Sequence, residues 1–242
     1  MSDPKRLFII HGDKGGVGKS LFARVLVHYL TTRKIACDYY DCDETDDLYR
    51  FYPEIVSRCD FSKVSDIAPV LDRLMDGKGA PAALMDLAGG HGSELVDWLI
   101  RSRALEAAAE GDLKIVVFYL LGNTMSSINL LSTAYENLGD KVSWGIVKNL
   151  HFAPEFVSFD QTARLRPALI AGGAIEIQMP ELDKEIGTII DRDELSFDKA
   201  RKQLPFTPRG YLRTWLDGVC GQLEEHGARL GLGSAPAPAP AG

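Results

Sequence analysis

Residues Gly12–Ser20 read GDKGGVGKS, between a short apolar run, Leu7–Ile10, and a segment, Leu21–Leu30, whose apolar residues have helical spacing. Glycines let a backbone turn its N–H groups toward an anion, and the N-terminal end of a helix adds positive charge at the same place. A strand, such a loop and a helix in succession are typical of a phosphate-binding site. The stretch therefore predicts a buried parallel strand, a phosphate-binding loop and a helix.

The lysine and the hydroxyl near the end of this loop have distinct expected roles. Lys19 is expected to bind the β- and γ-phosphates of a nucleotide as a point charge, and the Ser20 hydroxyl is expected to ligate Mg²⁺. The common form of the motif has a glycine where Asp13 stands, and here a second lysine, Lys14, precedes the glycines. The predicted nucleotide-binding residues of the segment are Gly15, Gly16, Val17, Gly18, Lys19, Ser20 and Leu21.

The segment KGGVGKS resembles the deviant Walker A motif of the ParA/MinD-type ATPases, which belong to the SIMIBI class of P-loop NTPases. The resemblance implies an ATPase that uses ATP and Mg²⁺ and closes into a homodimer on binding nucleotide. It also implies a catalytic role for Lys14, which would reach the nucleotide of the partner subunit. There it would place positive charge where the leaving phosphate develops negative charge.

A second motif of this family is an Asp-x-Asp switch at the end of the second strand. Asp41-Cys42-Asp43 closes the apolar segment Ile35–Asp41. By the resemblance, Asp43 is the catalytic residue that orients the attacking water, and Asp41 belongs to the Mg²⁺ site. Family members often continue with proline, whereas this chain continues Glu44-Thr45-Asp46-Asp47, so the partner contacts of its switch differ.

A third motif is an acid at the end of the next apolar strand, followed by glycine. Ala82–Leu87 contains Asp86, which matches the acid that holds Mg²⁺ in the family. Gly89 and Gly90 match the flexible glycines of switch II, which move when the γ-phosphate leaves. The resemblance extends from Leu7 to Asn149, and beyond it only the order of elements agrees.

The signals for the base are weaker than those for the phosphates. Asn149 follows a predicted strand, Val142–Leu150, where family members often have an asparagine that contacts adenine; capping a turn is the equal alternative. The stretch Met179–Leu182 resembles a proline-bearing loop that borders the base. The sequence contains no Asn/Thr-Lys-x-Asp motif, which guanine-binding relatives carry.

Apolar segments alternate between strand and helix along the rest of the chain. Further strands are predicted at 114–121 and 174–179, and helices at 67–75, 94–103, 126–138, 164–171 and 211–230. This alternation predicts an α/β fold: a doubly wound, mostly parallel sheet flanked by helices, as in P-loop NTPases. We expect one ATPase domain over residues 1–230 and a flexible Pro/Ala-rich tail over 231–242.

Composition bounds the class of protein and its partners. The 242 residues are 45% hydrophobic and 25% charged, which excludes disordered, collagenous and disulfide-framework proteins. No segment has the apolar length of a signal peptide or a spanning helix, so a cytoplasmic protein is expected. The net charge of −7 does not indicate nucleic acid, although five bases without an acid between Lys199 and Arg213 keep DNA contact open. The last predicted helix carries acids, which disfavours membrane binding.

The sequence favours a slow, partner-stimulated ATPase that acts as a molecular switch, with an unidentified protein partner. Plasmid or mobile-element partition, conjugation and protein positioning are the roles that the resemblance suggests. Three alternatives stay open, one of them a non-hydrolysing protein–protein scaffold that would bind ATP tightly without releasing phosphate. The second is an ATPase for metal-centre maturation, which the scattered Cys37, Cys42, Cys59 and Cys220 disfavour. The third is an ATP-dependent small-molecule ligase or kinase resembling dethiobiotin synthetase, which has no need of Lys14.

Overall fold

The computed structural model of the chain describes residues 4–12, 15–43, 45 and 47–233. They form a seven-stranded sheet in the order β3-β2-β4-β1-β5-β6-β7, and every neighbouring pair is parallel. The strands are β1 (Lys5–Gly12), β2 (Asp38–Cys42), β3 (Val56–Arg58), β4 (Ala82–Leu87), β5 (Leu113–Leu121), β6 (Ser143–Asn149) and β7 (Ile175–Met179). The predicted α/β fold with a parallel sheet is confirmed.

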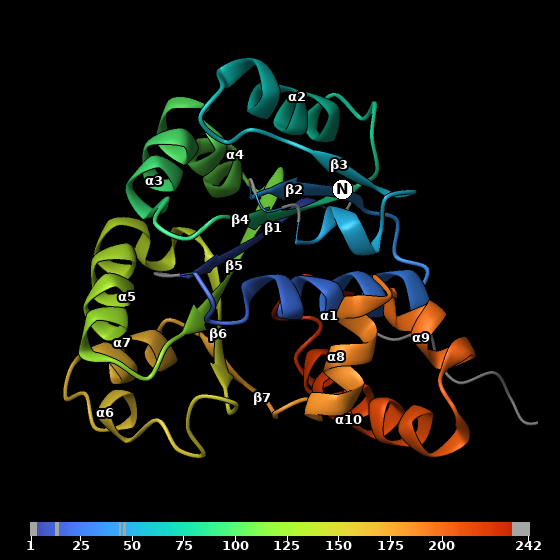
Figure 1. Cartoon of the computed structure of the whole chain (residues 1–242). Helices are drawn as coiled ribbons and strands as arrows, with labels where there is room; N and C mark the ends of the chain where they lie inside the picture. The colour runs from blue at the N-terminus through green and yellow to red at the C-terminus, as the bar shows by residue number, and fades with distance from the viewer. Residues whose placement is uncertain (1–3, 13–14, 44, 46, 234–242) are drawn as a thin grey trace, which may run out of the picture.

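Helices cover both faces of the sheet (Figure 1). One layer consists of α1 (Lys19–Thr32), α8 (Lys184–Arg192), α9 (Phe197–Gln203) and α10 (Phe206–Glu225). The other consists of α2 (Val64–Met75), α3 (Gly92–Arg101), α4 (Ala104–Glu110), α5 (Met125–Leu138), α6 (Val157–Asp160) and α7 (Leu165–Ala171). Two short 3₁₀ turns, η1 (Tyr49–Phe51) and η2 (Gly139–Lys141), lie in the connections.

The central strands are continuously apolar because both of their faces are covered. Along β1, Phe8 and Ile10 pack into the core beneath α1 and α10, whereas Leu7 and Ile9 pack into the core on the opposite face. Successive side chains of a strand point to opposite faces, so a strand buried on both sides has no polar alternation. The apolar run that opens the chain therefore becomes a central strand.

The sequence missed several short elements and misplaced one end of the last helix. Strand β3 and helices α4, α6, α8 and α9 were not predicted, and α10 spans Phe206–Glu225 in place of 211–230. The packed body extends past the predicted start of the tail. Leu232 is buried in the core, and the Gly231 carbonyl accepts a hydrogen bond from Arg6 Nη1 at 3.4 Å. Both contacts hold residues 231–232 against the packed body. Residues 234–242 of the predicted tail lie outside the described residues.

The carboxyl ends of β1, β2 and β4 lie at one edge of the sheet, because the strands are parallel neighbours. In the register of the sheet Asp86 of β4 is paired with Ile10 of β1 on one side and with Asp41 of β2 on the other. Two acids and the loop after β1 are thus brought together by strand order. Among the described residues no helix is long and apolar enough to cross a lipid bilayer.

Candidate functional site

The loop between β1 and α1 presents an open helix end. Gly18 is the N-cap of α1 with φ +97°, and among the described residues no side chain caps this terminus. The amide Nδ2 of Asn149, at the end of β6, donates a hydrogen bond to the Val17 carbonyl at 3.1 Å. A positive φ and the absence of a side-chain cap leave the N–H end of the helix facing a cavity, which is the arrangement that binds anions.

A cavity of about 480 Å³ lies against this loop. It is lined by Gly15, Gly16, Gly18, Lys19, Ser20, Leu21, Arg24, Asp43, Thr45, Asp47, Arg50, Phe51 and Asp191. Lys19 is only 5% exposed. The structure thus brings most of the predicted phosphate-binding residues to one cavity, which we call the phosphate cavity. Val17 is buried, and its side chain packs behind the loop.

Asp86 is fully buried at the end of β4. Neither of its carboxylate oxygens has a hydrogen-bond partner within the described part of the chain. Burial raises the pKa of Asp86 to about 8; the Asp41 carboxylate adds to this rise, whereas the Ser20 hydroxyl and Lys19 oppose it. A buried acid without partners is costly unless it is protonated or binds a cation. The orphaned oxygens beside Ser20 therefore suit a hard divalent cation such as Mg²⁺.

The carboxylate of Asp41, at the end of β2, is held by backbone N–H groups of the loop that follows. Its Oδ2 accepts hydrogen bonds from the backbone N–H groups of Leu48 at 2.8 Å and Tyr49 at 2.7 Å, and Oδ1 accepts one from Asp43 N at 3.1 Å. Burial still raises the pKa of Asp41 despite these bonds. Its carboxylate therefore stabilises the loop after β2, and its place in the Mg²⁺ site stays a prediction.

Asp43 lies at the start of that loop and lines the phosphate cavity. Its Oδ1 accepts hydrogen bonds from the backbone N and the hydroxyl of Thr45, at 3.1 and 3.0 Å. The side chain is thus held by a short local turn at the cavity wall. Its water-orienting role stays a prediction. Lys14, the predicted trans-acting lysine, lies outside the described residues.

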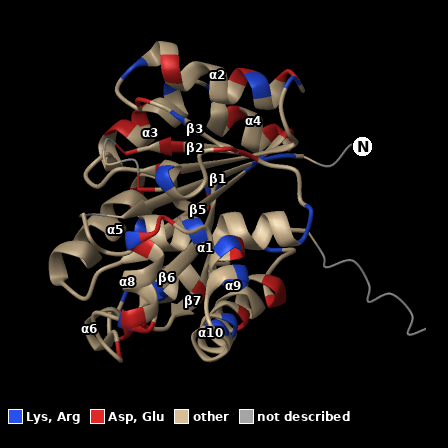
Figure 2. Ribbon diagram, turned by 45° about the vertical axis from the view of Figure 1, so that its right-hand side comes forward, with Lys and Arg blue, Asp and Glu red and all other residues tan. Residues whose placement is uncertain are grey.

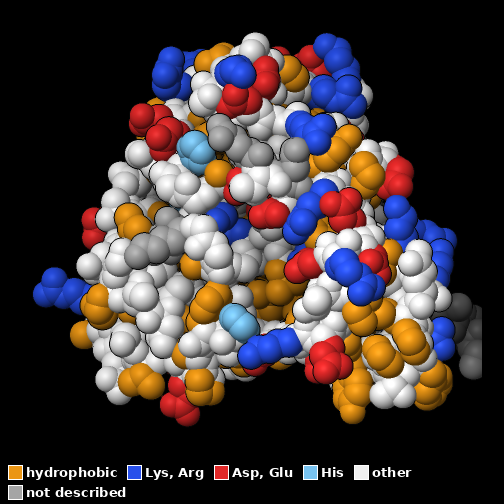
Figure 3. All heavy atoms as spheres, viewed as in Figure 1, with side chains coloured by type: hydrophobic (Ala, Val, Ile, Leu, Met, Phe, Trp, Pro, Cys, Tyr) orange, Lys and Arg blue, Asp and Glu red, His pale blue; other side chains and the backbone are white. Residues whose placement is uncertain are grey.

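A second cavity of about 310 Å³ adjoins the phosphate cavity. Both are lined by Gly16, Gly18, Leu21, Arg24 and Asp191, and the second is completed by Asn149, His151, Phe152, Pro180, Leu182, Gly187 and Ile190. Its apolar and aromatic walls suit a purine ring, so we call it the base cavity. The predicted proline-bearing loop contributes Pro180 and Leu182. Figure 3 shows this side of the molecule, with a hollow whose floor is hydrophobic and whose edges carry charges.

The amide of Asn149 is already used within the protein. Besides the bond to Val17, its Oδ1 accepts a hydrogen bond from His151 N at 3.1 Å. The side chain is 3% exposed. Its observed role is to tie β6 to the loop after β1, and the adenine contact stays a prediction.

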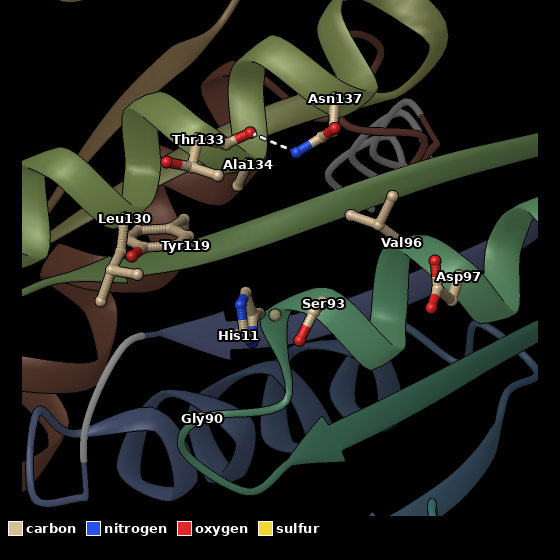
Figure 4. Close-up of a pocket in the computed structure, with 11 residues that line it drawn as sticks. His11, Gly90, Ser93, Val96, Asp97, Tyr119, Leu130, Thr133, Ala134 and Asn137 are labelled. Carbon is tan, nitrogen blue, oxygen red and sulfur yellow. Dashed lines mark hydrogen bonds between the residues drawn. The ribbon is translucent and has the colours of Figure 1, made fainter.

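A further cavity of about 340 Å³ lies between α3 and α5 (Figure 4). His11 of β1 and Gly90, from the predicted switch II segment, line it. Gly90 has φ +93°, and Gly89 beside it is exposed. Burial lowers the pKa of His11 to about 4, with Lys19 and His91 adding to the effect, and its Nδ1 has no partner among the described residues. His11 is therefore a neutral imidazole at pH 7.

The basic cluster near the C-terminus is partly neutralised. Lys199 Nζ lies 3.0 Å from Glu54 Oε1, and Arg213 Nε lies 3.5 Å from Asp217 Oδ2. Figure 2 shows basic and acidic residues interspersed over the helices of this region. Two of the five bases thus have an acidic partner, and DNA contact stays a prediction.

Two of the cysteines that are distant in sequence are neighbours in space. Cys42 ends β2, and Cys59 follows β3; the Cys59 N–H donates to the Asp41 carbonyl at 2.8 Å. Hydrogen bonding to the Cys59 thiol and burial hold the pKa of Cys42 well above its ordinary value. The same hydrogen bond lowers the pKa of the Cys59 thiol. No cluster of three or more potential metal-ligating side chains occurs in the described ranges.

Several residues of these cavities were missed by sequence reasoning. Arg24 lies one helical turn after Ser20, and Arg50 and Phe51 lie in η1. Asp191, on α8, is 167 residues from its partner Arg24. The i+4 spacing of Ser20 and Arg24 was a usable signal for the first, whereas nothing in the sequence links the others to the loop.

Comparison with known proteins gave few matches in sequence and more in structure. No family model matches the chain. Protein MobD of Acidithiobacillus ferrooxidans is 25% identical over 240 residues, covering 91% of this chain and 97% of MobD. The structure of MinD in the Aquifex aeolicus MinC:MinD complex aligns with a TM-score of 0.55 and 14% identity over 97% of this chain and 98% of that one. The structure of Aquifex aeolicus MinD aligns with 0.53 and 13% over 89% and 97%.

These likenesses define the class of the fold. The chain has the fold of the SIMIBI-class P-loop NTPases, of the MinD type. The predicted fold is therefore confirmed at the level of class.

Proposed function

We propose that the chain is an ATPase that binds Mg-ATP, closes into a homodimer and acts as a nucleotide-dependent switch. The observation that carries this proposal is the convergence on one cavity of an uncapped helix N-terminus and the buried Lys19, with the orphaned Asp86 carboxylate beside Ser20. An anion seat next to a cation seat is what a metal-bound triphosphate requires. The MinD-type fold supports the same conclusion.

The residues divide the work by their chemistry. The N-terminus of α1 and Lys19 would neutralise the terminal phosphates, and the base would enter the apolar cavity beside Pro180 and Phe152. Ser20 and Asp86 would hold Mg²⁺, which supplies charge neutralisation of the phosphates when bound. Asp43, at the wall of the phosphate cavity, is placed to orient a water by accepting its hydrogen bond.

In the proposed dimer, Lys14 is the residue that reaches from one subunit to the nucleotide of the other. In this proposal Lys14 of the partner subunit adds a positive charge at the leaving phosphate, as an arginine finger does. The Lys14→Ala variant should bind ATP normally and lose most of its turnover. A ligase or kinase would retain turnover, so the variant separates the two functions.

The dimer is tested with the Asp43→Ala variant. It should bind ATP without hydrolysing it and accumulate as a dimer on light scattering with Mg-ATP, but not with Mg-ADP. Asp76→Ala is the matched control, because Asp76 is an exposed acid paired with Lys78 away from the cavity. An Asp43→Ala protein that stays monomeric with Mg-ATP would refute the assignment of Asp43 to the switch.

The switch implies a partner that reads the closed state. The MinD of the Aquifex aeolicus complex is bound to MinC, which supports a protein partner for this chain as well. Partition, conjugation or protein positioning remain the proposed settings, in the cytoplasm. The trapped Asp43→Ala dimer is the form with which to isolate the partner. Full ATPase activity in protein freed of transition metals would exclude the metal-centre alternative.

A further inference from the structure

Two arginines share one aromatic ring at the wall of the phosphate cavity. The guanidinium carbon of Arg24, on α1, lies 3.9 Å from the ring centroid of Phe51, and that of Arg50 lies 4.7 Å from the same centroid. Phe51 itself is 1% exposed. A fully buried ring therefore fixes two positive charges close together beside the loop that follows β1, in a cavity of which all three residues form part.

Both guanidiniums have donors to spare. Arg24 is 9% exposed and donates from Nη1 to Asp191 Oδ1 at 3.1 Å, and Arg50 Nη2 lies 3.5 Å from Asp47 Oδ1. The Nε atoms of Arg24 and Arg50 are buried without a hydrogen-bond partner within the part of the chain that the structure describes. An unsatisfied buried donor costs about 1–3 kcal/mol, more when charged. Two guanidiniums that line one cavity, each paired with one acid in the described part of the chain, suit an anionic ligand.

The position of each arginine indicates which part of a nucleotide it would meet. Arg24 lines both the phosphate cavity and the base cavity, so it stands at their junction. Arg50 lines the phosphate cavity and lies on the loop that begins at Asp43. The phosphate nearest the sugar would therefore fall to Arg24, and the outer phosphates to Arg50.

The loop that carries Arg50 is anchored at its far end. The Tyr52 hydroxyl donates to the Arg24 carbonyl at 3.3 Å, and Phe197 N donates to that hydroxyl at 3.4 Å. The end of the loop is thus tied to α1 and α9, while its start is held by Asp41. A phosphate bound by Arg50 would hold the loop at a further point between these two anchors.

We propose that Arg24 and Arg50 form a guanidinium clamp that binds the phosphates of the nucleotide from the chain's own loop, in addition to Lys19, and so couples the loop from Asp43 to Phe51 to the bound nucleotide. The clamp rests on the proposed function. Guanidinium groups match phosphate oxygens in planar, two-point hydrogen bonds. Asp47 and Asp191 act as their counterions while no phosphate is bound.

The clamp is tested by titrating ATP and ADP calorimetrically into the wild type and the variants Arg50→Gln, Arg24→Gln and Arg58→Gln. Arg58 is the matched control: its guanidinium carbon also lies over an aromatic ring, 3.8 Å from the Tyr49 centroid, but the residue lines a neighbouring cavity. We expect Arg50→Gln and Arg24→Gln to bind ATP at least about tenfold more weakly, as for a lost charged hydrogen bond. Arg58→Gln should bind as the wild type does.

Melting temperatures of the variants distinguish the loss of a phosphate contact from a loss of folding stability. Arg50 is partly exposed, so Arg50→Gln should melt near the wild type without nucleotide and show a smaller rise with ATP. Arg50→Lys, which keeps the charge and loses the fork, should bind with intermediate affinity. If Arg24→Gln fails to fold, Arg50→Gln decides alone.

The outcomes separate the two proposals. A wild type that binds no ATP contradicts the proposed function and the clamp with it. A wild type that binds ATP, with Arg50→Gln binding within twofold of Arg58→Gln, overturns the clamp and leaves the proposed function standing.

Discussion

The side-chain amide of Asn149, at the end of β6, donates a hydrogen bond to the carbonyl of Val17, in the loop after β1, at 3.1 Å. The two residues are 132 positions apart, and the bond is buried. It fixes the loop just before the helix end that faces the phosphate cavity. The shape of this loop is therefore set by a distant strand as well as by the glycines.

The closeness of Asn149 predicts a specific sensitivity of Gly18. A Cβ at Gly18 would lie 2.4 Å from Asn149 Nδ2, and its φ of +97° is unfavourable for other residues. Gly18→Ala should lower the free energy of unfolding by more than the roughly 1–3 kcal/mol of backbone strain, because the held amide must also move. Chemical denaturation of the nucleotide-free protein measures this loss.

Gly16 supplies the matched control for that measurement. It also has a positive φ, +82°, but a Cβ there would meet none of the described residues within 4 Å. Gly16→Ala should therefore lower the free energy of unfolding through backbone strain alone. When Asn149→Ala is added to Gly18→Ala, the part of the loss that comes from the clash should be regained. Equal losses for the two alanine variants would mean that Asn149 does not constrain the loop.

Asp86→Asn should stabilise the nucleotide-free protein. The pKa of Asp86 is raised from 3.8 to about 8 on folding, so the folded state binds this proton more tightly and stability falls as pH rises from 3.8 toward 8. Asparagine cannot titrate, so the free energy of unfolding of the variant should lack this decrease with rising pH. Unfolding free energies between pH 6.5 and 8 measure the difference.

The same variant tests the metal assignment. Mg-ATP should stabilise the wild type more than ATP alone does, and this magnesium increment should vanish in Asp86→Asn. A magnesium increment of undiminished size in the variant would show that the cation is held elsewhere.

His11 should impose the opposite pH dependence at lower pH. Its folded pKa is lowered from 6.5 to about 4, so the unfolded state binds the proton more tightly. Stability is fully present above pH 6.5 and is lost as pH falls toward 4, by about 3 kcal/mol at most. His11→Asn should lose less stability than the wild type over this interval. Parallel pH profiles for the two proteins would contradict the burial of a neutral imidazole.

The central strands and the position of the glycine-rich loop between β1 and α1 could be predicted because their signals are local. Lys114–Leu121 reads KIVVFYLL and forms the buried strand β5, and the glycines of residues 15–18 stand between a strand and a helix as expected. Each of these segments carries its own pattern, which the surrounding fold reinforces.

The missed elements depend on tertiary contacts. β3 is only Val56–Arg58, with a single buried residue at the edge of the sheet, and α9 has the polar sequence FDKARKQ. Their formation depends on packing against neighbours, which no short window of sequence records.

The same limit applies to the site. The acids at strand ends could be assigned from order along the chain, but the binding of Asp41 to the N–H groups of Leu48 and Tyr49 depends on the path of a loop. Arg24, Arg50 and Asp191 resemble surface charges in the sequence, because their common cavity exists only after folding.

The affinity of the protein for ATP with and without the Lys19 side chain tests the central claim most directly. Calorimetric titration should show ATP binding by the wild type and by Lys184→Ala, an exposed control on α8, with the Lys19→Ala protein checked for a cooperative melt. We predict no measurable ATP binding by folded Lys19→Ala, because the phosphates lose their main counterion in a partly desolvated seat. Wild-type ATP affinity in that variant would contradict the account.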